Sequence, residues 1–307
     1  MSERAGDRPA VLLLGGGGLV GIELRRALAP RGTIVAPTRA ELDLTDADAL
    51  RRAVRELAPQ AILNAAAYTA VDQAEREPAL AHAINADAPG VLAAEAARLG
   101  VPFVHYSTDY VFDGTSDAPY AEDAPTAPLN VYGATKLAGE RAVLSSGARA
   151  LVLRTSWVYG AHGRNFLATM LRLAERADGA PVRVVGDQQG APTASGFIAD
   201  ATARMLAVAE SGGAWGLYHV ATRGVTTWYD FARAIFAGAR RRGWRVPDVE
   251  RITTAEHGSP TRRPAYSVLD STRAERAFGV VAEPWRAQLE RVLDARLGAP
   301  SLVPEPS

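Results

Sequence analysis

Short apolar runs alternate with longer amphipathic segments through the first half of the chain. Five apolar runs have the length of strands, at residues 10–14, 33–36, 61–64, 102–107 and 150–155. The segments between them are rich in alanine and have helical periodicity, at residues 21–29, 46–57 and 79–99. Strands that are apolar on both faces and alternate with helices are typical of a parallel sheet covered on both sides. The pattern therefore predicts an α/β fold with a doubly wound parallel sheet.

The pattern becomes less regular after about residue 158, where Gly and Pro are frequent. It still predicts a strand at residues 216–221 and a helix at residues 228–241. We expect this part to form a smaller lobe that is interleaved with the first. The predicted organisation is a first domain at residues 9–158, a substrate-binding lobe at residues 159–297 and a mobile tail at residues 298–307.

Composition and charge exclude several classes of protein. The chain has 34 basic and 34 acidic residues, so no net field would attract a nucleic acid or an anionic membrane. It has no cysteine, which excludes disulfides and thiolate catalysis, and its five histidines lack metal-ligand spacing. No run approaches the roughly 18 apolar residues of a membrane span, and the N-terminus lacks the apolar core of a signal peptide. We expect a cytoplasmic protein without a catalytic metal.

A glycine loop follows the first predicted strand and leads directly into a helix. Gly15, Gly18 and Gly21 have the spacing G-x-x-G-x-x-G. Such glycines permit a tight turn and a close approach to a pyrophosphate, which the free N–H groups of the helix N-terminus would bind. The alternative is a flexible glycine-rich turn, but the position between strand and helix favours a Rossmann-type dinucleotide site.

The end of the second predicted strand indicates which dinucleotide binds. A site for NAD usually has Asp or Glu about 20 residues after the loop, where it holds the ribose 2′-hydroxyl. The sequence there is Ala36-Pro37-Thr38-Arg39, without an acidic residue, and Arg39 could contact a 2′-phosphate instead. We predict that NADPH is the preferred cofactor, with NADH possibly also accepted.

Tyr132 and Lys136 are candidate reacting groups. They are four residues apart in a predicted helix, so both side chains lie on one face. Lys136 is the only lysine of the chain, and a compact ammonium lowers the pKa of a nearby phenol and can bind ribose hydroxyls, whereas a forked guanidinium serves this role badly. The alternative is a chance pair on an exposed helix face. The arginine bias elsewhere favours the catalytic interpretation.

Thr108 is the candidate third member of this group. It follows the fourth predicted strand, and ligands bind beyond the carboxyl ends of strands in open parallel sheets. Its hydroxyl could donate a hydrogen bond to a substrate carbonyl oxygen. Ser107 is the competing hydroxyl at this point of the sequence.

The chain resembles the extended short-chain dehydrogenase/reductase superfamily and, within it, the dTDP-4-dehydrorhamnose reductase family. The resemblance rests on segments in the expected order, at residues 15–21, 64–75, 107–114, 132–136, 154–160, 186–193 and 262–270. It implies that Thr108, Tyr132 and Lys136 are the catalytic residues. Together with the loop argument it implies cofactor contacts from Gly15, Gly18, Leu19, Val20, Gly21, Asp43, Leu44, Ala65, Ala66, Ala67, Tyr106, Tyr132 and Lys136. It implies substrate contacts from Thr108, Asp109, Trp157 and Arg263.

The resemblance also implies a function, with alternatives. The expected reaction is NAD(P)H-dependent reduction of the C4 ketone of dTDP-4-dehydro-L-rhamnose, in dTDP-rhamnose biosynthesis, by a possible homodimer. A 4-ketoreductase for a different nucleotide deoxysugar is an alternative that the sequence barely separates from this one. A non-catalytic NADP-binding regulatory subunit is a second alternative, although it would have no chemical need for Thr108, Tyr132 and Lys136 together.

Overall fold

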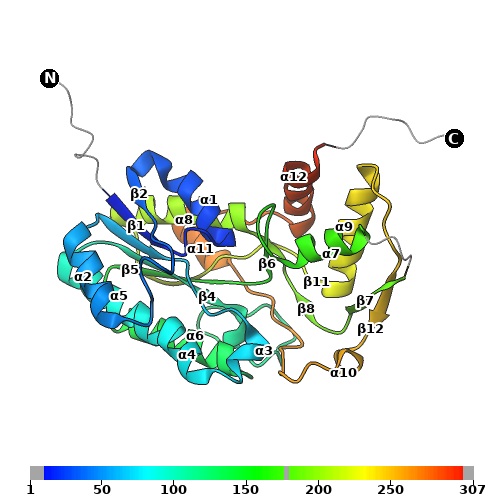
Figure 1. Ribbon diagram of the computed structural model, residues 1–307, viewed down its shortest axis with the longest axis horizontal. Coiled ribbons are helices and arrows are strands. Elements are labelled where there is room, and N and C mark those ends of the chain that lie inside the picture. The colour runs from blue at the N-terminus through cyan, green and yellow to red at the C-terminus, as the bar shows by residue number, and fades with distance from the viewer. Residues whose placement is uncertain (1–9, 176–179, 300–307) are drawn as a thin grey trace.

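The computed structural model describes residues 10–175 and 180–299, and within them a six-stranded parallel sheet forms the centre (Figure 1). Its strand order is β10-β5-β4-β3-β1-β2. The strands are β1 (Ala10–Leu14), β2 (Thr33–Val35), β3 (Ala61–Asn64), β4 (Phe103–Thr108), β5 (Ala150–Thr155) and β10 (Gly216–His219). The predicted α/β fold with a parallel sheet is confirmed. The predicted mobile tail lies outside the described residues from residue 300 onward.

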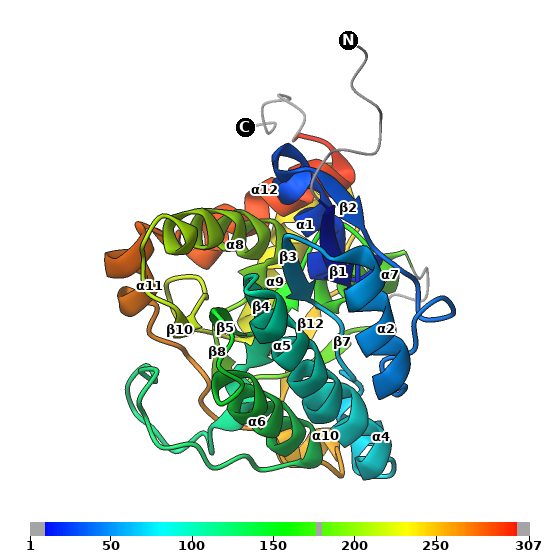
Figure 2. The same cartoon turned by 90° about the vertical axis from the view of Figure 1, so that its left-hand side faces the viewer.

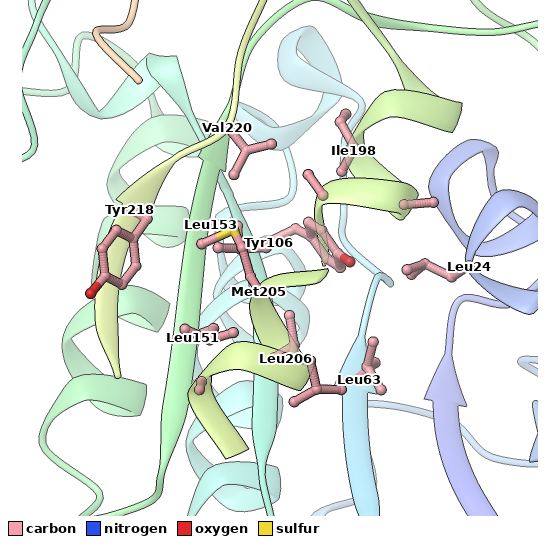
Figure 3. Close-up of a cluster of buried hydrophobic side chains, with 14 of the residues drawn as sticks. Leu24, Leu63, Tyr106, Leu151, Leu153, Ile198, Met205, Leu206, Tyr218 and Val220 are labelled. Carbon is pink, nitrogen blue, oxygen red and sulfur yellow. The ribbon is translucent and has the colours of Figure 1, made fainter. Parts of the chain in front are cut away.

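Helices cover both faces of this sheet, as the alternation of side chains along β1 requires. Val11 and Leu13 face the helices α1 and α8, whereas Leu12 and Leu14 face α2 and α5. Figure 2 shows α5 between α2 and α6, and Figure 3 shows Leu24 of α1 and Met205 of α8 packed on the other face. The covering helices are α1 (Leu19–Leu28), α2 (Ala47–Leu57), α5 (Ala88–Leu99), α6 (Val131–Leu144), α8 (Ser195–Glu210) and α11 (Thr272–Phe278).

The helix predicted at residues 79–99 is interrupted in the structure. It consists of α4 (Pro78–His82), the π-helical turn η2 (Ala83–Asp87) and α5. The turn places Asn85 so that its side chain accepts from Tyr68 N at 2.8 Å and donates to Thr135 Oγ1 of α6 at 3.1 Å. Apolar periodicity alone does not reveal a single inserted residue, which explains why one helix was predicted.

The later part of the chain builds a second core and also completes the first. Aromatic and aliphatic side chains pack between α7 (Phe166–Ala174), α9 (Trp228–Arg241) and α12 (Trp285–Leu297). Three pairs of short strands lie beside them: β6 (Val158–Tyr159) with β9 (Thr193–Ala194), β7 (Val182–Val185) with β12 (Val249–Ile252), and β8 (Gln189–Gly190) with β11 (Thr226–Thr227). The remaining elements are η1 (Ala29–Arg31), α3 (Val71–Ala74), η3 (Asp109–Val111) and α10 (Thr254–His257). Because β10 belongs to the central sheet and precedes α9 and α12, the chain returns to its first core before it completes the second.

The sheet has its topological switch point between β1 and β3. The chain leaves β1 toward β2 on one side, and β3 lies on the other, so the loops after β1 and β3 diverge at their carboxyl ends. The glycine loop lies there, and a Cβ at Gly15 would come within 2.6 Å of Ala66 N. A Cβ at Gly21 would collide with the Gly15 carbonyl oxygen. Both glycines are therefore required by close packing of backbone on backbone.

No helix within residues 10–175 and 180–299 is both long and apolar enough to cross a membrane.

The glycine loop gives a matched pair of substitutions. We expect Gly21→Ala to lower the free energy of unfolding by about 1–3 kcal/mol, because the new Cβ displaces the loop backbone. We expect Gly17→Ala to change it by less than about 0.5 kcal/mol, since no heavy atom lies within 4 Å of a Cβ there. Urea denaturation of the two variants measures this difference, and equal stabilities would contradict the packing argument.

Candidate functional site

A cavity of about 410 Å³ lies at the switch point, between the glycine loop and the end of β2. Residues that follow β3 close its opposite side. Seven of the fourteen residues predicted to bind a cofactor line it, namely Gly15, Gly18, Arg39, Asp43, Leu44, Ala66 and Ala67. Ala65 supports the loop from below, because a Cβ at Gly15 would come within 2.7 Å of its carbonyl carbon. The cavity is therefore bounded by the elements expected of a dinucleotide site.

The N-terminus of α1 opens beside this cavity. Gly18 is the N-cap residue and has no side chain that could satisfy the first N–H groups of the helix. The predicted contacts Leu19 and Val20 are the first two helical residues, so their N–H groups have no partner within the helix. The wall near Gly17 is open, since no atom lies within 4 Å of a Cβ placed there. Backbone donors, a helix dipole and open space together suit an anionic group.

Two arginines frame the cavity. Arg39 is exposed at its rim, where the sequence argument expects a 2′-phosphate contact. Arg25 was not predicted, although it lines the same cavity and bridges the loop to the end of β2, donating to Gly16 O at 3.1 Å and to Ala36 O at 3.4 Å. Its position four residues after Gly21, on the same face of α1, is the signal that could have identified it.

Thr108 and Tyr132 meet at the carboxyl end of β4. The Thr108 hydroxyl lies near the Tyr132 phenol, and it donates to Asp109 Oδ1 at 3.0 Å. The ring of Tyr110 packs edge-on against Tyr132 with centroids 5.5 Å apart. The structure therefore brings together two of the three predicted catalytic side chains.

Lys136 lies one helical turn beyond Tyr132 and is only 2% exposed. Its Nζ donates to the Tyr106 carbonyl oxygen at 2.6 Å and lies 3.2 Å from His105 Nε2. The Tyr106 side chain points into the core, where its hydroxyl bonds Thr202, as Figure 3 shows for the ring. Only the backbone of Tyr106 faces the site. The predicted contact of Tyr106 with a cofactor would therefore have to use backbone atoms.

The pKa values of the reacting pair differ from the sequence-based expectation. Burial raises the pKa of Tyr132 to about 12, although the nearby Thr108 hydroxyl opposes this change. Burial lowers the pKa of Lys136 to about 8, against the influence of Glu140. The ammonium was expected to lower the pKa of the phenol. Desolvation outweighs that effect here, and the lysine nitrogen is bonded to the Tyr106 carbonyl.

Ser107, the competing hydroxyl, belongs to a different network. It donates to Glu140 Oε1 at 2.5 Å, and Glu140 forms a two-pronged ion pair with Arg154, at 2.8 Å to Nε and 2.7 Å to Nη2. Glu140 is 1% exposed and Arg154 is 3% exposed. This buried pair joins α6 to β5, and because it engages the Ser107 hydroxyl, Thr108 is the hydroxyl at the strand end that lies outside this network.

Asp109 is a buried carboxyl next to Thr108. Burial raises its pKa to about 6, while the nearby hydroxyls of Ser267 and Thr108 oppose this rise. Its Oδ2 atom is buried without a hydrogen-bond partner among the described residues. Asp109 therefore has an acceptor available at the point where the sequence predicts a substrate contact.

Trp157 has an unusual backbone conformation, with φ at +46° in the left-handed region. Its indole stacks on Trp228, with ring centroids 3.6 Å apart and planes inclined by 5°. Gly190 lies against the ring so closely that any Cβ there would overlap it. Packing thus fixes the orientation of this predicted substrate contact.

Arg263 is committed to an ion pair. Its Nη2 atom lies 3.0 Å from Asp72 Oδ2 and 3.1 Å from Oδ1, at the start of α3. The arginine thereby ties the segment before residue 264 to the first domain. A diphosphate contact from Arg263 would have to share or replace this pairing.

No group of three or more His, Asp or Glu side chains placed to hold a metal ion occurs in the part of the chain that the structure describes.

Comparisons with known proteins show which proteins the chain resembles. The family profile described as the RmlD substrate binding domain matches residues 9–297. The chain is 47% identical to the dTDP-4-dehydrorhamnose reductase of Burkholderia thailandensis, over 90% of this chain and 95% of that protein. It is 43% identical to the Escherichia coli K12 enzyme of the same name, over 92% and 97%. A crystal structure of the Bacillus anthracis dTDP-4-dehydrorhamnose reductase in complex with NADP superposes with a TM-score of 0.86 at 35% identity, covering 94% of this chain and 99% of that one.

The raised pKa of Asp109 predicts a stability difference that depends on pH. The wild-type protein loses folding stability as pH rises from about 4 through 6, because the pKa of Asp109 in the folded state, about 6, exceeds its value in the unfolded state. Asp109→Asn lacks this loss, so its stability relative to wild type should increase by about 2–3 kcal/mol between pH 4 and pH 8. Denaturation curves at both pH values measure it.

Asp43→Asn is the control for this prediction. Hydrogen bonds from Thr45 lower the pKa of Asp43, so its contribution is present above the unfolded pKa and is lost as pH falls. The stability of Asp43→Asn relative to wild type should therefore decrease as pH rises from about 2 to 4 and change little between pH 4 and pH 8. The same direction in both variants would contradict the electrostatic assignment.

Proposed function

The chain belongs to the dTDP-4-dehydrorhamnose reductase family, and from this premise we propose how its own residues carry out the reaction. The enzyme reduces the C4 ketone of dTDP-4-dehydro-L-rhamnose to the hydroxyl of dTDP-L-rhamnose. NADPH, when bound, supplies the hydride. The proposal concerns which side chains bind, orient and donate a proton.

The cavity at the switch point fits such a dinucleotide. Because Gly15 and Gly21 lack a Cβ, the backbone segments of the loop pack closely against their neighbours, and the wall near Gly17 is open. We propose that the N–H groups of Leu19 and Val20 bind the diphosphate and that Asp43 and Leu44 border the adenine. Arg39 binds the 2′-phosphate in this proposal, as a charge at the rim of the cavity.

The placement of Tyr132 near the Thr108 hydroxyl, one helical turn from Lys136, is the single observation that best supports the catalytic assignment. As C4 is reduced, its carbonyl oxygen becomes an alkoxide and takes the proton of the Tyr132 phenol. The O–H bond of Tyr132 breaks, a new O–H bond forms on the sugar, and a phenolate remains. The Thr108 hydroxyl turns from Asp109 to the carbonyl oxygen and donates to the developing negative charge.

The substrate is proposed to lie between the two parts of the chain. Asp109 would accept a sugar hydroxyl with its unpaired Oδ2 atom, and the indole of Trp157, held by Trp228, would pack against the sugar ring. Arg263 would reach the diphosphate while remaining near Asp72. In this arrangement, residues 9–158 bind the cofactor and also supply Thr108, Asp109 and Trp157 to the substrate, and residues 159–297 form the predicted substrate-binding lobe and supply Arg263.

An assay of NADPH oxidation with dTDP-4-dehydro-L-rhamnose and related dTDP-4-keto-6-deoxyhexoses tests the function itself. The expected result is fastest turnover with dTDP-4-dehydro-L-rhamnose. Faster turnover of another ketosugar would favour the alternative reductase. Binding of NADPH without oxidation on any ketosugar would favour a regulatory subunit. The predicted homodimer and cytoplasmic location stay predictions from the sequence.

Removal of the proposed proton donor should lower the rate but leave the cofactor bound. General acid catalysis contributes about 10²–10⁴-fold, so Tyr132→Phe should lower kcat by at least 10²-fold, with the Kd for NADPH nearly unchanged. Tyr110→Phe is the matched control, because it removes a neighbouring phenol that contacts Tyr132 only with its ring edge. Stopped-flow turnover and NADPH fluorescence titration measure the two quantities. A nearly active Tyr132→Phe would refute the assignment.

The proposed role of Arg39 predicts a change in cofactor preference. Arg39→Ala should raise the KM for NADPH by about 10-fold or more, because a charge-assisted hydrogen bond to the 2′-phosphate is lost. The KM for NADH should change little, since NADH lacks that phosphate. Initial rates with both cofactors measure this, and an equal increase for both would show that Arg39 does not read the phosphate.

A further inference from the structure

A buried row of three polar side chains runs from α6 across two strands of the sheet. It consists of Lys136, His105 on β4 and Asn64 on β3, which are 2%, 0% and 0% exposed. His105 Nε2 lies 3.2 Å from Lys136 Nζ, and His105 Nδ1 lies 3.4 Å from Asn64 Nδ2. Asn64 and His105 are also directly paired in the register of β3 and β4. The proposed reaction gives no role to His105 or Asn64.

The hydrogen bonds of Asn64 determine which nitrogen of His105 carries a proton. Asn64 Oδ1 accepts from the N–H of Ala66 at 3.2 Å, and this contact orients the amide so that Nδ2 faces the histidine. An amide nitrogen can only donate, so His105 Nδ1 must accept. Burial and the nearby Lys136 hold the pKa of His105 well below its usual value, and the ring is therefore neutral. A neutral ring that accepts at Nδ1 carries its proton on Nε2.

The proton on His105 Nε2 faces Lys136 Nζ and affects whether the lysine is an ammonium or an amine. An ammonium has three donors and no acceptor, so it would oppose a second donor at 3.2 Å, whereas an amine can accept from it. We propose that Asn64 and His105 are positioning residues, and that His105, fixed by Asn64, donates to the amine form of Lys136. This inference rests on the proposed catalytic role of Lys136 and specifies how its proton is controlled.

The other groups around Lys136 do not reverse this arrangement. Glu140 on α6 favours the ammonium, but its carboxylate is already paired with Arg154 of β5. Tyr132 on α6 is held neutral by its own raised pKa. The π-helical turn packs against α6 with the uncharged Asn85, and β4 adds only the Tyr106 carbonyl, which accepts a hydrogen bond from either form of the lysine.

Such an arrangement makes Lys136 a ready proton source. Each turnover leaves Tyr132 as a phenolate that is one proton short. An N–H bond of the Lys136 ammonium breaks, the phenol O–H bond is restored, and the resulting amine accepts the hydrogen bond of His105. Water then returns a proton to the amine. The lowered pKa of Lys136, about 8, is consistent with proton release near neutral pH.

The single lysine allows a direct test without cofactor or substrate. Protein made with [13Cε]lysine and without lysine in any tag gives one NMR signal, that of Lys136, whose shift follows its ionisation. His105→Phe replaces the donor with a ring of similar size that cannot donate. The Lys136 amine then loses its hydrogen bond, so the pKa of Lys136 should rise by about half a unit or more. If His105 instead accepted from the ammonium, the pKa would fall. A fall, or no change, overturns the proposal.

Asn64→Leu supplies a second variant that retains the imidazole. Without the amide donor, His105 can move its proton to Nδ1 and accept from the ammonium, so the pKa of Lys136 should again rise. A rise in His105→Phe alone would overturn the role of Asn64. His219→Phe is the control, because His219 is equally buried and borders Arg154 instead. The His219→Phe variant should change the pKa of Lys136 by less than about 0.2 units.

A rate measurement separates this inference from the proposed function. The basic limb of the pH profile of kcat should move to higher pH in His105→Phe by the same amount as the NMR titration. If Tyr132→Phe is nearly active while the NMR shifts are as expected, the catalytic assignment fails and the proton control remains. If Tyr132→Phe is inactive as expected but the NMR shifts are absent or opposite, only the proposed control of the Lys136 proton is overturned.

Discussion

A buried pair of opposite charges fixes the helix that carries the reacting groups to the central sheet. Glu140 lies one turn beyond Lys136, and its two oxygens are both bonded to Arg154 of β5. Loss of either partner would leave a charge unpaired in the core, which typically costs about 3–5 kcal/mol. Arg154 also lies over the Phe112 ring, 5.1 Å from its centroid. The ion pair therefore holds α6, β5 and the loop after β4 in one arrangement. The positions of Lys136 on α6 and Thr108 at the end of β4 depend on that arrangement.

The sequence predicts the central architecture because parallel strands and covering helices have distinct periods. The segment at residues 228–241 forms α9 with the predicted bounds, and the strand at residues 61–64 forms β3. Predictions were less accurate where tertiary contacts decide the local structure. The strand predicted at residues 216–221 ends at His219, where the chain turns toward the second core. The interruption at η2 is set by the contacts of Asn85 with other elements, which no local pattern contains.

The structure brings the predicted site residues near one another, whereas their pKa values differ from those expected from the sequence. Spacing alone places Tyr132 and Lys136 on one face of α6, and the end of β4 places Thr108 beside them. The pKa of the phenol rises instead of falling, because burial depends on the whole fold and the lysine nitrogen bonds Tyr106 O. Long-range pairs such as Arg263 with Asp72, 191 residues apart, are equally invisible in a single sequence.

The π-helical turn has a consequence for how this segment can change during evolution. Removal of one residue from Ala83–Asp87 would restore a continuous α-helix and rotate one side of it by about 100° relative to the other. Either Asn85 would leave Tyr68 and Thr135, or Leu92 and its neighbours on α5 would leave the sheet. Loss of one residue from this turn therefore requires two packed surfaces to be rebuilt at once.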